Sequence, residues 1–202
     1  LVVFEFPDGF ENDPLRNGSK YIKRIVAGPD DTLQIINKEI FINRVQVKLP
    51  TTMKVSKDSQ RGGWIKEDLI YPPGTDWNRD NYGPLIIPAK GDTIKISPEN
   101  FETLQSIIVM DYGERSLLAE GTLITLNGSA IKEYILQQDH YFVIGDNFDV
   151  SMDSRQFGFI TDNMIIGKPI FVYWSFDDEK VAPGPLGFLS AIRANRIFLG
   201  ID

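Results

Sequence analysis

Residues 21–48 read YIKRIVAGPDDTLQIINKEIFINRVQVK, and their pattern decides the fold class. Short runs of β-branched and other apolar residues alternate with Gly, Pro, Asp and Asn, which is typical of strands joined by tight turns. Asn37-Lys38 and Asn43-Arg44 lie where two-residue hairpin turns would fall. The strands expected around these turns are 32–36, 39–42 and 45–48.

The same pattern continues on both sides of this stretch. LVVFEF at residues 1–6 is typical of a strand, and Asn127-Gly128 divides an expected hairpin at 122–133. Further strands are expected at 140–145 and 167–176. We therefore class the fold as mainly β.

One internal helix is predicted. Ser97 is a suitable N-cap, Pro98 suits the first helical position, and Glu99 favours the positive end of the helix dipole. Gly113 is the expected end of this helix. A weaker helical segment is expected at Leu186–Arg196. The apolar face of the first helix consists of Phe101, Leu104, Ile107 and Ile108.

Residues 50–92 break the regular pattern. They are rich in turn-forming residues, which predicts an inserted or exposed loop region. We therefore expect two lobes. The chain ends, 1–31 and 140–202, would form a β core, and residues 32–139 would form a second, mostly β lobe that is inserted into this core and carries the helix.

Composition excludes several kinds of chemistry. The net charge of −7 argues against nucleic-acid binding, which needs a basic face. The absence of cysteine excludes disulfides, a thiolate nucleophile and a cysteine-rich zinc site. A single histidine, His140, makes a metal centre improbable, and no GxSxG motif of the α/β-hydrolases is present. No metal or other cofactor is expected.

Lys23 is the first candidate for catalytic chemistry. Alternate residues of a strand share a face, so Tyr21, Lys23 and Ile25 point the same way. Arg24 then points the other way, and one of the two basic side chains must face the core. A lysine in an apolar site has its pKa lowered by up to about 3–5 units, which leaves a neutral amine able to act as a general base. The alternative is an edge strand whose lysine extends to water.

The second candidate is GDNFDVSMDSRQFG, residues 145–158. It follows the apolar run YFVI and holds three aspartates, an asparagine, two serines and an arginine between two glycines. Asp and Asn beside Gly also form ordinary turns, so composition leaves both a structural turn and an active-site loop open. Calcium is disfavoured, because the spacing departs from the EF-hand pattern and no bidentate glutamate closes the loop.

Three further polar features have simpler interpretations. Asn78–Asn81, in DWNRDNYGP, is interpreted as a loop. Asp30-Asp31 follows Pro29 and is interpreted as closing a turn. His140, before YFVI, is interpreted as a surface or strand-end histidine rather than a catalyst.

Several segments resemble the bacterial type I signal peptidases. YIKRIVAGPDDTLQI resembles the family's lysine box, GDNFDVSMDSRQFGFI its second signature, and LVVFEFP the strand that opens its core. IIGKPIFVYWSFD and RANRIFLGI resemble its closing strand and terminal segment. These matches occur in the family's order, whereas residues from about 38 to 139 match only in general character.

The resemblance implies a signal-peptidase-like β fold and a serine endopeptidase with a Ser–Lys dyad. Members of this family are anchored in the bacterial cytoplasmic membrane by a transmembrane helix. Their catalytic domain lies on the outer face, where it removes N-terminal signal peptides from exported preproteins. The partners implied are these signal peptides and the membrane, without nucleic acid.

The resemblance also implies residue roles. Lys23 falls on the general base, and Ser151 falls on a serine that hydrogen-bonds and orients this lysine. Tyr21 and Ile22 fall on the strand that binds substrate by β-augmentation, and Phe4 falls on an apolar wall beside the lysine. The residues implied to support the loop are Gly145, Asp146 and Asn147 at its start and the ion pair Asp153–Arg155.

The family's nucleophile is a serine in an SM-x-P-like motif that follows the membrane helix and precedes the LVVF strand. The chain starts in what resembles the middle of that strand. We therefore expect that upstream residues, including this serine, are absent from the sequence. Ser151 also precedes a methionine, but its position matches the lysine-orienting serine.

Some positions depart from the family pattern. Phe148 and Val150 replace the arginine and asparagine that are common in the family's GDNRDNS form of the loop. Gly28 stands where an aliphatic residue is common, and Asp30 stands where a glycine is usual, although Asp tolerates left-handed backbone better than most residues. Asn78–Asn81 reads NRDN and so matches the middle of the family's GDNRDNS motif. It lacks the S-x-D-S-R that follows in the family, so we interpret it as an unrelated loop.

Three alternatives stay open. The first alternative is another Ser–Lys peptidase of the self-cleaving repressor type, which a DNA-binding segment upstream would favour. An upstream sequence without the serine motif would favour a non-catalytic paralogue that binds peptides or envelope partners. The third is a β-rich interaction domain with a fortuitous polar loop, which the ordered set of matches disfavours.

Overall fold

The computed structural model describes residues 1–6, 19–56, 69–112, 117–177, 180 and 187–201. Their regular secondary structure consists mainly of short antiparallel strands, as predicted. The N-terminal strands are β1 (Val2–Glu5), β2 (Lys20–Ala27), β3 (Thr32–Ile36), β4 (Glu39–Ile42), β5 (Val45–Gln46), β6 (Tyr82–Ile86) and β7 (Thr93–Lys95). The C-terminal strands are β8 (Leu117–Glu120), β9 (Leu123–Leu126), β10 (Ser129–Ala130), β11 (Glu133–Ile135), β12 (His140–Ile144), β13 (Ile160–Thr161), β14 (Ile165–Gly167), β15 (Phe171–Val172) and β16 (Leu199–Gly200). The helices are α1 (Phe101–Tyr112), α2 (Ser154–Phe157) and the 3-10 helices η1 (Asp162–Met164), η3 (Gly187–Ala191) and η4 (Ala194–Arg196).

One sheet joins the two ends of the chain. Its strand order is β13-β12-β2-β1-β14, so β1 and β2 pair with strands that follow more than a hundred residues later. β1 pairs with Lys20–Lys23 of β2, whereas β12 pairs with β2 between Arg24 and Ala27. The two neighbouring strands therefore cover different halves of β2, and the change of partner falls next to Lys23.

A second sheet, β5-β4-β3-β6, contains two predicted hairpins. Asn37 and Lys38 have φ values of 49° and 69°, and Asn43 and Arg44 have 52° and 69°. Positive φ at both central residues is the signature of a two-residue hairpin turn that matches the twist of the strands. The structure thus confirms both turns, and it also confirms the predicted turn at Asn127-Gly128 between β9 and β10.

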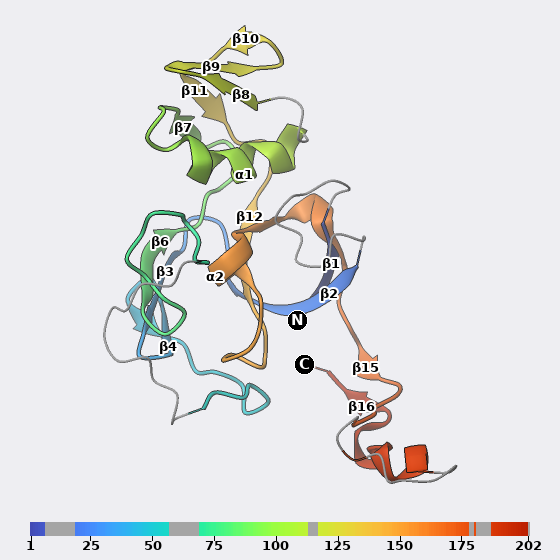
Figure 1. The fold of residues 1–202 in the computed structure, drawn as a ribbon. Coiled ribbons are helices and arrows are strands. Elements are labelled where there is room, and N and C mark those ends of the chain that lie inside the picture. The colour runs from blue at the N-terminus through green and yellow to red at the C-terminus, as the bar shows by residue number, and fades with distance from the viewer. Residues whose placement is uncertain (7–18, 57–68, 113–116, 178–179, 181–186, 202) are drawn as a thin grey trace.

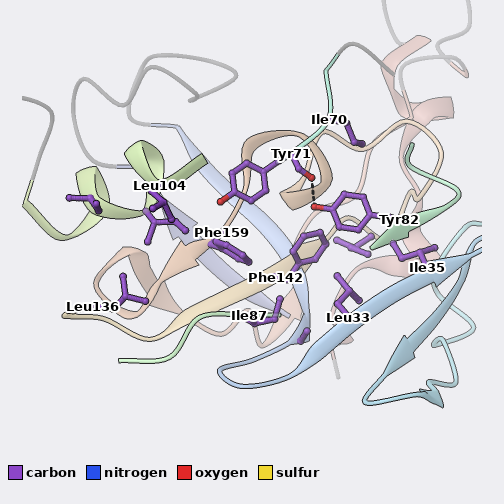
Figure 2. Packing of buried hydrophobic residues seen from close by; sticks show 14 of the residues in the cluster. Leu33, Ile35, Ile70, Tyr71, Tyr82, Ile87, Leu104, Leu136, Phe142 and Phe159 are labelled. Atoms are coloured by element: carbon purple, nitrogen blue, oxygen red, sulfur yellow. Dashed lines mark hydrogen bonds between the residues drawn. The ribbon is translucent and has the colours of Figure 1, made fainter. Parts of the chain in front are cut away.

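The larger hydrophobic cluster is shared between the expected lobes. Ile35 of the four-stranded sheet packs in the same cluster as Phe142 of β12 and Phe159 (Figure 2). Tyr82 lies among them and donates its hydroxyl proton to the Tyr71 carbonyl at 2.5 Å, which satisfies a polar group inside the core. The inserted segment and the segment formed by the chain ends are therefore packed on one another, and the two-lobe division remains a prediction.

Helix α1 starts later than predicted. Asn100 N–H donates to the Ser97 carbonyl, and the Asn100 side chain accepts the Ser97 N–H at 2.8 Å, so Ser97 closes a turn and the helix begins at Phe101. The predicted cap at Ser97 is wrong, because Ser97 and Asn100 form a local turn that precedes the helix. The predicted end at Gly113 lies outside the described residues. The apolar face is buried as predicted, through Leu104, Ile107 and Ile108.

The predicted exposed loop region, 50–92, is partly buried. Residues 82–86 form β6 and pair with β3, and Ile70 and Tyr71 enter the core. Residues 57–68 lie outside the described residues. The prediction of exposure failed because turn-forming residues indicate the local backbone conformation and do not indicate which other segments pack over it.

Two smaller predictions also need correction. The strand expected at 167–176 is divided into β14 and β15, with Pro169 between them, and proline cannot donate to a strand ladder. In place of the helical segment expected at Leu186–Arg196, the structure has the short 3-10 helices η3 and η4, and Leu186 itself lies outside the described residues.

The sheets are distributed along an elongated molecule. Figure 1 shows α1 and the strands β7 to β11 at one end, and β15 and β16 at the other. The five-stranded sheet and the four-stranded sheet lie between these ends. Among the described residues, no helix is long and apolar enough to cross a membrane.

Two neighbouring isoleucines of β3 point to opposite faces of the strand. Ile35 is fully buried, whereas Ile36 is 38% exposed. We expect Ile35→Ala to lower the free energy of unfolding by about 2–5 kcal/mol, because it leaves a cavity in the shared cluster. Ile36→Ala is the matched control and should cost less than about 1 kcal/mol. Urea unfolding measures both, and equal losses would contradict the packing described here.

Candidate active site

Lys23 lies on β2 with the side chains that the alternation predicts. Tyr21 and Ile25 pack against the smaller hydrophobic cluster, whereas Ile22 is 56% exposed. Lys23 shares the face of Tyr21 and Ile25 and is itself half-buried. Arg24 points to the opposite face of the strand. The lysine therefore leaves the sheet towards apolar surroundings, as the core-facing alternative requires.

The structure brings Lys23 and Ser151 together. Lys23 Nζ donates a hydrogen bond to Ser151 Oγ at 2.7 Å, across a separation of 128 residues. Ser151 is 9% exposed. A hydroxyl at this distance fixes the direction of the lysine amine, because it takes up one of the few hydrogen-bonding directions of the nitrogen.

The loop after β12 can make this contact only because residue 145 is a glycine. A Cβ atom on Gly145 would lie 2.0 Å from Ser151 Oγ and 3.3 Å from Lys23 Nζ. The first distance is far below a van der Waals contact. The serine and the lysine therefore meet in the space that any other side chain at this position would occupy.

A buried ion pair closes the loop. Asp153 and Arg155 have fully buried side chains, and Asp153 Oδ2 accepts both Arg155 Nη2 at 2.7 Å and the Gly145 N–H at 3.1 Å. Asp153 also forms the N-cap of α2. Arg155 Nη2 donates in addition to the Phe148 carbonyl at 2.7 Å. One carboxylate thus holds both ends of the loop, and one guanidinium holds its middle.

Asp146 and Asn147 are fixed from outside the loop. Asp146 accepts two hydrogen bonds from Arg24, from Nε at 3.0 Å and from Nη2 at 3.1 Å. Asn147 forms a β-bridge with Lys54 and accepts the N–H of Ser151 at 2.9 Å. The start of the loop is therefore tied to both β2 and the inserted segment.

Burial lowers the pKa of Lys23. The largest cause is loss of hydration of the ammonium group, the charge of Asp153 acts in the opposite direction, and the charge of Arg155 lowers the pKa further. The neutral amine is thereby favoured relative to an exposed lysine. A neutral amine is what a general base needs.

Apolar side chains lie on β1 and on the same strand and loop as the two polar partners. Phe4 is fully buried and stacks on Tyr21, with ring centroids 5.4 Å apart. Ile22, next to Lys23, is exposed, as are Val150 and Met152 on either side of Ser151. The structure thus places an apolar wall behind the strand and apolar side chains at its surface.

The two replaced positions of the loop have different environments. Phe148 is fully buried in the larger cluster, and the Arg155 guanidinium lies 4.0 Å from its ring centroid, a cation–π contact. Val150 is 71% exposed. The phenylalanine therefore anchors the loop in the core. Asp30, which stands where the family usually has a glycine, has a left-handed backbone with a φ of 65°.

Two parts of the site were missed by sequence reasoning. Arg79, from the loop interpreted as unrelated, donates from Nη1 to the Asp149 carbonyl at 3.2 Å, and its own carbonyl accepts Arg155 Nη1 at 3.3 Å. Lys38, a hairpin residue, forms an ion pair with Asp149. The Asn and Asp residues of Asn78–Asn81 indicate a turn stabilised by side-chain hydrogen bonds, but their sequence does not indicate which residues this turn contacts.

His140 is a strand-end histidine but not a surface one. It is the first residue of β12, is fully buried, and lies edge-on to Phe159 with ring centroids 5.7 Å apart. Burial lowers its pKa, which favours the neutral ring. Of the two predicted positions, the strand end is therefore confirmed and the surface is not. The His140 N–H donates to the Pro88 carbonyl at 3.3 Å, so this end of β12 is covered by residues from the segment before it.

Comparison with known families decides the relationship. Residues 1–174 match the model of the family described as signal peptidase, peptidase S26. The chain belongs to the signal peptidase family. Both the lysine box and the loop after β12 lie inside the matched range.

Curated relatives agree with this family. The chain is 41% identical over 196 residues to a signal peptidase I of Buchnera aphidicola subsp. Acyrthosiphon pisum, covering 91% of this chain and 56% of the relative. It is 26% identical over 197 residues to the signal peptidase I of Aquifex aeolicus, covering 96% and 69%. A signal peptidase I crystal structure from Enterococcus faecalis V583 shares 18% identity, with a TM-score of 0.40 and coverage of 83% and 92%.

This chain spans a little over half the length of several curated signal peptidase I relatives. Two further relatives from Buchnera aphidicola, of subspecies Baizongia pistaciae and Schizaphis graminum, are 27% identical, and the matches cover 58% of each. Membership of the family is therefore a statement about the matched residues.

The close approach at Gly145 predicts the effect of a single methyl group. Gly145→Ala should separate Ser151 from Lys23, because the new Cβ would lie 2.0 Å from Ser151 Oγ. The matched control is Gly167→Ala in β14, where nothing lies within 4 Å of the new Cβ. Crystal structures of both variants measure the Nζ–Oγ distance. An unchanged distance in Gly145→Ala would contradict the packing.

The lowered pKa of Lys23 predicts a pH-dependent stability. Between the folded-state pKa and the ordinary lysine value of about 10.4, the unfolded chain binds the proton and the folded chain does not. The free energy of unfolding therefore rises with pH in this window, and the contribution is lost as pH falls through the folded-state pKa. We expect Lys23→Met to remove this rise. Urea unfolding from pH 7 to 10 measures it, with Lys20→Met, exposed on the same strand, as control.

Proposed function

We propose that this chain carries the catalytic machinery of a serine endopeptidase that removes N-terminal signal peptides from exported preproteins, with Lys23 as its general base. One observation carries the proposal. In a member of the signal peptidase family, a half-buried lysine on the core strand lies 2.7 Å from a buried serine hydroxyl.

Lys23 performs the proton transfers. The neutral amine takes the proton from a serine hydroxyl as its oxygen attacks the carbonyl carbon of the scissile peptide bond. The ammonium returns this proton to the nitrogen of the leaving amine, the peptide bond breaks, and an acyl-enzyme remains. Lys23 then takes a proton from water, whose oxygen attacks the ester carbonyl carbon. The ammonium returns this proton to the oxygen of the attacking serine as the ester bond breaks, which releases the signal peptide and restores the neutral amine.

Ser151 holds the amine in line during these steps. Its Oγ accepts from Nζ, and the fixed loop 145–153 leaves it little freedom. The attacking serine is a different residue, which we place in sequence preceding Leu1 of the natural protein. The burial of Ser151 beneath Gly145 supports this division of roles, because a nucleophile must reach the substrate carbonyl.

Substrate binds in extended conformation beside β2. The exposed Ile22 and the neighbouring Tyr21 offer apolar contacts, and pairing of β12 with β2 stops at Arg24, just before Lys23. A signal peptide added at this point as a strand would present its scissile bond to the amine. Small side chains before the cleavage site would fit the shallow apolar surface there.

The proposed location is the bacterial cytoplasmic membrane, with this chain on its outer face. Membrane association is a general property of type I signal peptidases, and exported preproteins are the partners. No cofactor or metal enters the proposed reaction.

Cleavage of a preprotein by the full natural protein tests the proposal. Lys23→Ala should abolish cleavage, because it removes the proposed general base. Ser151→Ala should lower kcat by about 10–100-fold, since only the orientation of the amine is lost. Lys20→Ala, on the same strand but exposed, is the matched control and should retain the wild-type rate.

Each opposing outcome has a defined meaning. Near-normal cleavage by Lys23→Ala would end the assignment of the base. Complete loss in Ser151→Ala, with trapping of an acyl group on Ser151 in the parent enzyme, would make Ser151 the nucleophile. Binding of a signal peptide by a wild-type protein that never cleaves it would favour a non-catalytic paralogue.

A further inference from the structure

Two hairpin turns of the inserted segment have the same backbone but opposite surroundings. Lys38 and Arg44 each occupy the second turn position with a φ of 69°. Arg44 is exposed, as is usual for the tip of a hairpin. Lys38 is only 4% exposed. Burial of a lysine ammonium is costly unless it is paired and hydrogen-bonded, so its contacts must be specific.

The ammonium of Lys38 holds the loop that carries Ser151. It forms an ion pair with Asp149 Oδ1 and donates to the Ser56 carbonyl at 2.9 Å. Asp149 Oδ2 accepts the Ser56 N–H at 2.7 Å. Lysine, aspartate and backbone thus form a closed arrangement two residues from Ser151.

Arg79 holds the same residue from another side. Its guanidinium donates to the Asp149 carbonyl at 3.2 Å, and its carbonyl accepts Arg155 Nη1. Asp149 is therefore fixed through its side chain by Lys38 and through its backbone by Arg79. Both contacts come from outside the two segments that carry Lys23 and Ser151.

The hairpin and the Arg79 loop are also bound to each other. Lys38 N–H donates to the Asp80 carbonyl at 2.9 Å, and Asn37 N–H donates to Asn81 Oδ1 at 3.0 Å. Asn78 Oδ1 in turn accepts the N–H groups of both Asp80 and Asn81. The two elements therefore act as one rigid support, which we call the insert clamp and define as residues 37–38 and 78–81.

We propose that the insert clamp is a positioning device for catalysis, in which Lys38 and Arg79 set the position of Ser151 through Asp149 and thereby align the amine of Lys23. This inference rests on the proposed function. Neither residue touches the reacting atoms, so both are positioning residues. The segment inserted between the two halves of the site would then be required for the chemistry.

The path from the clamp to Ser151 is short. Ser151 N–H donates to the Asn147 carbonyl at 2.9 Å, so residues 147–151 form a single turn with Asp149 at its centre. A shift of Asp149 must therefore move Ser151. Misplacement of a catalytic group by about 1 Å can cost about 100-fold in rate.

Paired substitutions in the full natural protein test this proposal. Lys38→Met keeps approximately the length of the side chain and removes its charge, which removes the ion pair between Lys38 and Asp149. We expect kcat for preprotein cleavage to fall by about 10–100-fold while KM changes less than about 3-fold, because the substrate surface at Ile22 is untouched. Arg44→Met removes the same charge from the same kind of turn and should match the wild type.

The pH profile separates positioning from general weakening of the fold. If Ser151 moves away, water reaches Lys23, and the acid limb of the kcat profile should shift to higher pH in Lys38→Met. Loss of folded protein alone would lower the rate without moving this limb. Asp149→Asn and Arg79→Met provide second variants and should show the same direction of shift.

Amide hydrogen exchange gives a readout that does not need activity. Exchange of the Ser151 amide should accelerate at least about 10-fold in Lys38→Met and stay unchanged in Arg44→Met, because only the first variant releases the 147–151 turn. Equal kcat, pH profile and exchange in Lys38→Met and Arg44→Met would overturn the inference. A wild-type protein without cleavage activity would instead refute the proposed function, and exchange would still decide the role of the clamp.

Discussion

The buried ion pair between Asp153 and Arg155 is the constraint on which the rest of the site depends. Asp153 accepts the N–H of Gly145, so the first and last residues of the loop are joined through one carboxylate. Arg155 occupies the interior and binds the Phe148 carbonyl. Two charges without water are tolerated only when their hydrogen bonds are nearly complete, and here the loop backbone supplies the missing partners. The conformation of the loop and the satisfaction of the charges therefore require each other.

The sequence predicted the parts of the site that follow from local rules. Alternation along residues 21–26 placed Lys23 on the face of Tyr21 and Ile25, and the paired Asn-containing turns were located to the residue. The helix start was misplaced, because Ser97 and Asn100 close a turn with each other ahead of Phe101. In each of these cases the deciding interaction lies within a few positions of the residue concerned, where sequence patterns carry the most information.

Sequence reasoning failed where the role of a short polar segment depends on its contacts with a segment far away in the sequence. Asn78–Asn81 was interpreted as an unrelated loop, yet its backbone and Arg79 are bound to the loop that holds Ser151. The burial of Lys38 could not be predicted from its turn sequence either, because Arg44 occupies the same kind of turn and is exposed. Phe148 is the one sequence feature that reflects the burial of this loop. Its ring packs in the shared hydrophobic cluster, at a position where the family commonly has a charged residue.

The contacts of the 147–151 turn also determine when the site can form. Its partners are Lys38, Lys54 with Ser56, Arg79 and Arg155, which are drawn from four separate regions of the chain. Bringing regions that are far apart in the sequence together costs conformational entropy. The contacts of the turn offset this cost only when all of the distant partners are in place. The lysine and its serine should thus come together among the last events of folding. A chain that is still being made, or that has been cut within residues 32–139, would contain the residues of the candidate site without their geometry.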